Sequence, residues 1–96
     1  VADRQRLGAL LSEVSQLVSD GWRFVLCHGG GPQATQASKR VGLENTMVAG
    51  RRVTDEPTLQ VMKWVLAGEL SVDVVSVALA SGILGVGLSG VSAGLL

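Results

Sequence analysis

Residues 23–33 read RFVLCHGGGPQ, and this stretch decides the expected fold. An apolar run ends abruptly in three glycines, and a proline then opens a polar segment that is compatible with a helix. Consecutive glycines let the backbone adopt positive φ and leave no Cβ between the peptide N–H groups and a ligand. Pro32 suits the first helical position, because its missing N–H would be an orphan donor there. The stretch therefore predicts a strand, a turn and a helix whose N-terminus faces an anion.

Helical and strand-like patterns alternate on both sides of this stretch. Apolar spacings of three and four residues predict a helix over 3–19, and Gly21 is expected to end it. Consecutive apolar residues are typical of strands that are covered on both faces, and they predict strands over 22–27 and 83–88. The remaining elements are expected to be helices over 32–40, 57–68 and 72–81, the last one buried nearly all round, and a β-hairpin over 46–53 that turns at Ala49-Gly50.

Capping residues set the expected limits of the later helices. Thr54 is expected to cap the helix that follows it, with Asp55 and Glu56 in the first turn, where negative charge suits the helix dipole. Gly68 is expected to break that helix, and Ser71 to cap the next one.

The path from strand to strand through helices predicts an α/β fold with a mainly parallel sheet and right-handed crossovers. This arrangement places residues 28–31 and Ser89-Gly90 at the same carboxyl edge of the sheet. Open α/β sheets bind ligands at that edge.

The helix over 57–68 carries two apolar stripes. One stripe consists of Leu59, Met62 and Leu66, and the other of Val61, Trp64 and Val65. One face can cover the sheet, whereas the other needs a neighbouring subunit or the interior of a larger one, and a tryptophan there suits an interface. Both arrangements remain open from the sequence.

Composition argues against several classes of partner. Eight basic residues balance eight acidic ones, and the only aromatic residues are two tryptophans and one phenylalanine, so no nucleic-acid footprint is present. The single cysteine excludes an internal disulfide and a multi-cysteine metal site, and fits a reducing, cytoplasmic setting. Residues 74–96 carry no charge and could span a bilayer by length. Their glycines and serines favour a helix followed by a buried strand, and no membrane contact is expected.

Few residues could carry chemistry. The glycine triplet fits an anion-binding loop, or simply a tight turn. Arg51 and Arg52 point to opposite faces of a strand, so one guanidinium can reach a carboxylate, although both can also be solvated charges. His28 could act as a general base but is expected to hydrogen-bond its own loop. Cys27 is expected to pack as a small apolar residue.

Three blocks together resemble the amino acid kinase family. They are HGGGPQ at 28–33, GRRVTD at 50–55 followed by TLQVMKWVLAG at 58–68, and VGLSG at 86–90, in the family's order and spacing. The resemblance implies a three-layer αβα sandwich and transfer of the γ-phosphoryl of ATP, with Mg²⁺, to a carboxylate. In the branch that the blocks resemble, the acceptor is the side-chain carboxylate of N-acetyl-L-glutamate, on the route to arginine.

The resemblance also implies roles for residues of this chain. Gly30 and Gly31 would donate backbone N–H groups to the substrate, and Arg52 would hold one of its carboxylates. Possible phosphate or loop contacts are Gly29, Ser89 and Gly90. The helix over 57–68 is similar to the one that crosses its symmetry mate in family dimers.

The lysines that family members use for phosphoryl transfer have no counterpart in this sequence. Lys39 and Lys63 are the only lysines, and neither lies in a glycine-rich context. Residues 1–96 are therefore expected to form part of an N-terminal substrate-binding domain, without its first strand, without the ATP-binding half and without a catalytic residue. Three alternatives remain: a carrier-linked aminoadipate or glutamate kinase of lysine biosynthesis, a non-catalytic family member that binds an amino acid derivative, and a structural fragment whose main surface is the dimer helix.

Overall fold

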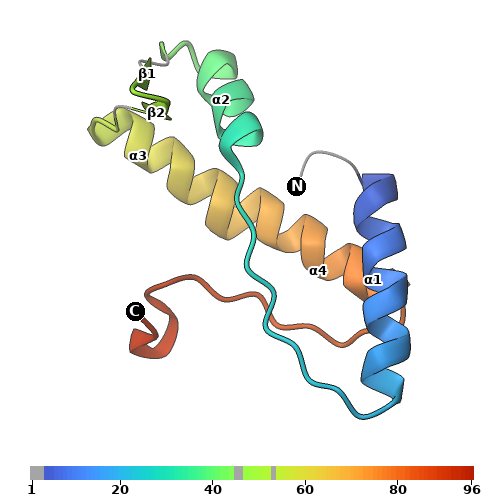
Figure 1. The fold of residues 1–96 in the computed structure, drawn as a ribbon. Coiled ribbons are helices and arrows are strands. Elements are labelled where there is room, and N and C mark those ends of the chain that lie inside the picture. The colour runs from blue at the N-terminus through green and yellow to red at the C-terminus, as the bar shows by residue number, and fades with distance from the viewer. Residues whose placement is uncertain (1–3, 45–46, 53) are drawn as a thin grey trace.

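The computed structural model describes residues 4–44, 47–52 and 54–96. Its elements are α1 (Arg4–Ser19), α2 (Gly31–Arg40), β1 (Met47–Val48), β2 (Arg51–Arg52), α3 (Glu56–Lys63), η1 (Trp64–Leu70), α4 (Ser71–Ala80) and η2 (Ser92–Gly94). The elements α3, η1 and α4 follow one another without a break and form one long helical rod (Figure 1). Helix α2 packs toward one end of this rod and α1 toward the other.

The predicted parallel sheet and three-layer sandwich are wrong for this structure. Residues 22–30 and 83–89 are extended but belong to no strand, and within the described ranges the only sheet is the antiparallel pair β1–β2. A strand needs a neighbour that accepts and donates its backbone hydrogen bonds, and these two segments lack one. Their apolar side chains consequently stay in solvent, with Val25 98% and Leu84 90% exposed.

The predicted hairpin is confirmed within the described residues. Met47 pairs with Arg52 and Val48 with Arg51, and residues 46 and 53 of the prediction lie outside the described part. Ala49 and Gly50 both have positive φ, at 52° and 76°. This is the pattern of a type I′ turn, whose twist matches that of the two strands it joins.

Three of the predicted limits of the helices over 57–68 and 72–81 are wrong. Gly68 lies inside the π-helical element η1 and does not end the helix, and Ser71 has helical φ and ψ of −60° and −46°. A glycine costs a helix only about 1 kcal/mol relative to alanine, which burial of Val65 and Leu70 on either side offsets. Asp55, rather than Thr54, is the N-cap of α3, because its side chain accepts a hydrogen bond from the backbone N–H of Thr58 at 3.0 Å.

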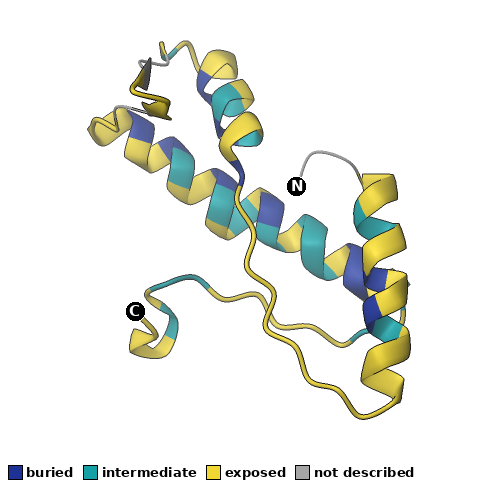
Figure 2. Ribbon diagram, viewed as in Figure 1, coloured by how far each residue is buried: buried dark blue, intermediate teal, exposed yellow. Residues whose placement is uncertain are grey.

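Two small hydrophobic cores hold the helices on the rod (Figure 2). The α2 core joins α2 to α3 and η1, and its buried residues are Ala34, Val61, Val65 and Leu70. The α1 core joins α1 to α4, and its buried residues are Leu11, Val77 and Ala78. Val72 and Leu79 of α4 are exposed, so the expectation that this helix is buried nearly all round is wrong.

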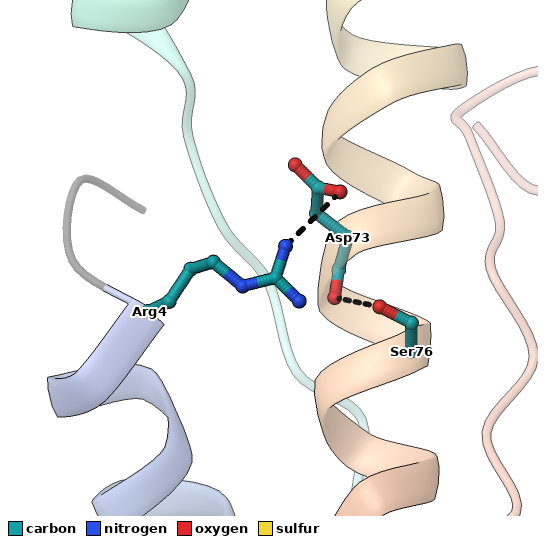
Figure 3. A network of polar contacts seen from close by, with 3 residues as sticks. All are labelled: Arg4, Asp73 and Ser76. Atoms are coloured by element: carbon teal, nitrogen blue, oxygen red, sulfur yellow. Dashed lines mark hydrogen bonds and ion pairs between the residues drawn. The ribbon is translucent and has the colours of Figure 1, made fainter.

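An ion pair bridges α1 and α4 beside the α1 core (Figure 3). Arg4 Nη1 lies 3.5 Å from Asp73 Oδ1, and Ser76 Oγ donates a hydrogen bond to the Asp73 carbonyl at 3.0 Å. Both charged side chains are substantially exposed, so the pair orients α1 more than it stabilises the fold.

The uncharged tail forms no membrane-spanning element in the described structure. None of the helices there combines the length and the apolar character that crossing a bilayer requires.

Candidate functional site

The glycine turn, residues 28–31, leads directly into α2. Gly30 is the N-cap, with an extended φ of −167°, and makes no side-chain capping hydrogen bond. Its carbonyl accepts the first bond of the helix, from the N–H of Ala34 at 2.9 Å. No glycine of the turn has positive φ, so the triplet is not needed for left-handed backbone. Pro32 is the second residue of α2 rather than the first, a position that also lacks an intrahelical acceptor.

The three glycines of the turn have different surroundings. Gly30 is buried, and a Cβ built on it would lie 2.7 Å from Leu66 Cδ2 and would overlap Leu70 Cδ1. A Cβ on Gly29 or on Gly31 would meet nothing within 4 Å, and both residues are exposed. Gly30 therefore allows close packing against η1, while its neighbours lie at the surface that a ligand can approach.

His28 and Cys27 precede the glycines on the extended segment. His28 Nδ1 donates to the carbonyl of Gly29 at 3.1 Å, which confirms the prediction that this histidine bonds its own loop. Cys27 is a free, exposed cysteine, so the prediction that it packs as an apolar residue is wrong. Its burial depended on the strand that does not form.

A buried polar group near the turn was missed by sequence reasoning. Gln33 Oε1 is buried and finds no hydrogen-bond partner in the described structure. A small cavity of about 60 Å³ beside it is lined by Gln33, Gln36, Ala37, Arg40 and Glu69. No pattern in the sequence signals this cavity, since it arises where α2 meets η1.

The structure does not bring the hairpin arginines to the glycine turn. The hairpin connects the C-terminal end of α2 to the start of α3, whereas the glycine turn lies at the N-terminal end of α2 (Figure 1). Ten helical residues separate these ends by about 15 Å. Arg52 is placed by its backbone pairing with Met47, and the Arg51 side chain is exposed.

Ser89 and Gly90 belong to a compact C-terminal turn. The N–H of Ser89 donates to Ser92 Oγ at 3.0 Å, and the N–H of Leu96 donates to the carbonyl of Gly90 at 2.9 Å. Because residues 22–30 and 83–89 form no parallel sheet with any other described segment, the carboxyl edge expected to hold both loops is absent from the described structure. The extended segment 83–89 contacts the rod through Gly87. A Cβ on Gly87 would overlap Ser71 Oγ and lie 3.6 Å from Val75 Cγ2.

The titratable groups do not assemble a metal centre in the part of the chain that the structure describes. No group of three or more His, Cys, Asp or Glu residues comes close enough there to hold an ion. Lys39 and Lys63 are exposed on α2 and α3.

The rod has one covered and one open face in its first half. Val61 and Val65 are buried in the α2 core, whereas Leu59 and Trp64 are exposed. An open groove of about 430 Å³ runs along α3 and is lined by Glu56, Pro57, Leu59, Gln60 and Lys63. The two separate apolar stripes predicted for residues 57–68 are not observed, because Met62 and Leu66 pack against the same α2 core as Val61 and Val65. Leu59 and Trp64, one from each predicted stripe, remain exposed.

Comparisons with known proteins give a consistent result. The sequence pattern described as "Amino acid kinase family" matches residues 1–96. The acetylglutamate kinase of Anaeromyxobacter dehalogenans strain 2CP-C is 61% identical over 74 residues, which cover 76% of this chain and 27% of the relative. The acetylglutamate kinase of Sorangium cellulosum is 46% identical over 86 residues, which cover 90% of this chain and 30% of the relative. The chain thus spans less than a third of the length of these relatives.

Proposed function

Because the chain belongs to the amino acid kinase family, we propose that it binds the acetylated amino acid in an acetylglutamate kinase. In the proposed reaction, a side-chain carboxylate oxygen of N-acetyl-L-glutamate attacks the γ-phosphorus of ATP. ADP leaves, and an acyl phosphate forms for arginine biosynthesis. The names of the relatives support the substrate, and the exposed thiol of Cys27 agrees with a reducing, cytoplasmic setting.

The observation that carries this proposal is the glycine turn at the N-terminus of α2. Helix N-termini attract anions, because their first N–H groups point outward and the helix dipole places partial positive charge there. N-acetylglutamate carries two carboxylates. We assign Gly30 and Gly31 to its backbone contacts, while Gly29 beside them is exposed and has room for a ligand.

The charge needed for phosphoryl transfer is a separate requirement. Phosphoryl transfer depends on positioning and on positive charge around the transferred group. Lys39 lies in the last turn of α2, at the opposite end from the glycine turn, and Lys63 lies on α3. We therefore assign this chain substrate binding and no catalytic residue, and no step here involves Mg²⁺.

Arg52 is proposed to hold one substrate carboxylate as a charge-assisted pair. In the full-length protein, Arg52→Ala should weaken N-acetylglutamate binding by about 1.5–3 kcal/mol, the scale of a hydrogen bond to a charged group, and leave ATP binding nearly unchanged. Isothermal titration calorimetry with each ligand measures both effects.

Arg51→Ala is the matched control, because adjacent strand residues point to opposite faces. It should change the affinity for N-acetylglutamate little. Unaltered substrate affinity in Arg52→Ala would remove Arg52 from the site. Binding of N-acetylglutamate without any binding of ATP would favour a family member that binds the ligand without catalysis.

The open face of the rod is proposed to form a homodimer. Leu59 and Trp64 are exposed on the segment that also contributes Val61 and Val65 to the α2 core. Tryptophan is among the residues that most often dominate interface energetics. The second copy would cover the surface that this chain leaves open.

A further inference from the structure

We propose that Leu66 and Leu70 of η1 are positioning residues for the glycine turn, a role that rests on the substrate binding proposed above. Gly30 packs against their side chains. Because these leucines hold Gly30 in place, they also fix the position of the exposed backbone of Gly29 and Gly31 on either side of it. The turn then presents its donors to the substrate in one arrangement.

The contact is close and buried. The two leucine side chains occupy the space that a Cβ on Gly30 would need, and Leu70 is itself only 4% exposed. Ala34 is fully buried in the same α2 core, and its N–H bonds the Gly30 carbonyl. Two kinds of contact therefore hold Gly30: packing against the leucine side chains and the first helical hydrogen bond.

Among the described residues, no strand adjoins the turn and helps to hold it. Residues 22–29 are extended, exposed and outside any sheet, so the chain reaches Gly30 without regular backbone pairing before it. Gly30 is the buried point of the turn, and its neighbours Gly29 and Gly31 are exposed. A misplacement of about 1 Å in a ligand-positioning group can cost two orders of magnitude in rate. Leu66 and Leu70 are therefore expected to control how the turn contacts the ligand without touching the ligand themselves.

The adjacent helix residue holds the other glycine-rich segment. Gly87 packs against Ser71, which directly follows Leu70. The two segments, which lie far apart in the sequence, thus dock on consecutive residues of one rod. The position of the rod at Leu70 and Ser71 sets the position of both.

The test uses size-exchange variants of the full-length protein. Gly30→Ala should collide with the leucines, and Leu70→Ala should leave the turn unsupported. Each should raise the KM for N-acetylglutamate about tenfold or more, with the KM for ATP unchanged. In the double variant Gly30→Ala/Leu70→Ala, the methyl added at residue 30 occupies space that the shortened side chain at residue 70 has left. The fold-increase in its KM should therefore be well below the product of the two single-variant increases. Leu70→Met, which conserves volume, should restore a KM close to that of the wild type.

Amide hydrogen exchange without ligand provides a second readout that does not depend on the substrate. Residues 29–31 and 33 should exchange faster in Leu70→Ala and at the wild-type rate in Gly8→Ala, where the added methyl meets nothing within 4 Å. Unchanged exchange in Leu70→Ala, or purely additive effects in the double variant, would overturn the proposal. If the wild type neither binds nor phosphorylates N-acetylglutamate, the proposed function is wrong, and the exchange rates alone decide whether the leucines hold the turn.

Discussion

Asp55 shows how one residue starts the long rod. Its carboxylate accepts the backbone N–H of Thr58, and hydrogen bonding from the side chain and then the backbone of Thr58 lowers the pKa of Asp55 below its ordinary value. A carboxyl group whose pKa is lowered by folding stabilises the folded state above its unfolded pKa, which is near pH 4. That contribution is lost as the pH falls through the lower, folded pKa.

Replacing Asp55 tests this cap. Asp55→Ala should lower the melting temperature at pH 7, because the N–H of Thr58 loses its partner. Asp55→Asn keeps a side-chain oxygen at the N-cap but cannot ionise, so it should retain most of the stability at pH 7 and lose less than the wild type below pH 4. Thermal unfolding followed by circular dichroism between pH 2.5 and 7 measures both. A melting temperature of Asp55→Ala that equals the wild-type value throughout would show that the cap contributes nothing.

At the scale of elements, the rod is held by different helices at its two ends. Helix α1 attaches through the α1 core, where Leu11 is 1% exposed and packs with Val77 and Ala78. The Arg4–Asp73 pair lies beside this core but is too exposed to contribute more than about 1 kcal/mol. Apolar packing, rather than the ion pair, therefore fixes α1.

The attachment of α1 can be measured with neighbouring leucines. Leu11→Ala should reduce the free energy of unfolding by about 2–5 kcal/mol, the usual cost of a cavity at a buried leucine. Leu10→Ala removes the same atoms from an exposed position and should stay within about 0.5 kcal/mol of the wild type. Chemical denaturation of all three proteins gives the comparison. Equal losses in the two variants would contradict the packing of α1 on α4.

The whole molecule is expanded for its length. Its radius of gyration is 15.2 Å, against about 12.5 Å for a compact chain of this size. Its accessible surface is 7264 Å², against about 5200 Å² for a compact monomer of this mass. Large apolar side chains contribute to this surface on the rod and on both extended segments. A partner that covers the rod would bury part of it.

The proposed dimer makes a prediction at this scale. Trp64 is 56% exposed on the open face of the rod, and Trp64→Glu should raise the dimer dissociation constant at least about tenfold. Val72→Glu places the same charge on another exposed apolar residue of the rod, outside residues 57–68, and should have little effect. Sedimentation velocity over a concentration series measures the constant. Identical constants for Trp64→Glu and the wild type would rule out this face as the interface.

The sequence by itself predicted what is determined locally. Apolar spacing located α1, the proline after the glycine triplet located α2, and Ala49-Gly50 located the hairpin turn. These signals are local because helical bonds and two-residue turns close within a few residues. Three motifs predicted the family that the comparisons show. For the candidate site, the sequence located the glycine turn and the hydrogen bond of His28 to its own loop.

Only the tertiary structure decided the long-range arrangement. Residues 22–27 and 83–88 have the composition of strands, yet a strand exists only where a remote segment completes its hydrogen bonds. No segment that the structure describes does so. Gly68 stays within a helix because Val65 and Leu70 pack on either side of it. Gly30 supports the turn by packing against Leu66 and Leu70, which lie 36 and 40 positions further along the chain. Contacts between residues so far apart depend on how the helices pack, which local periodicity does not specify.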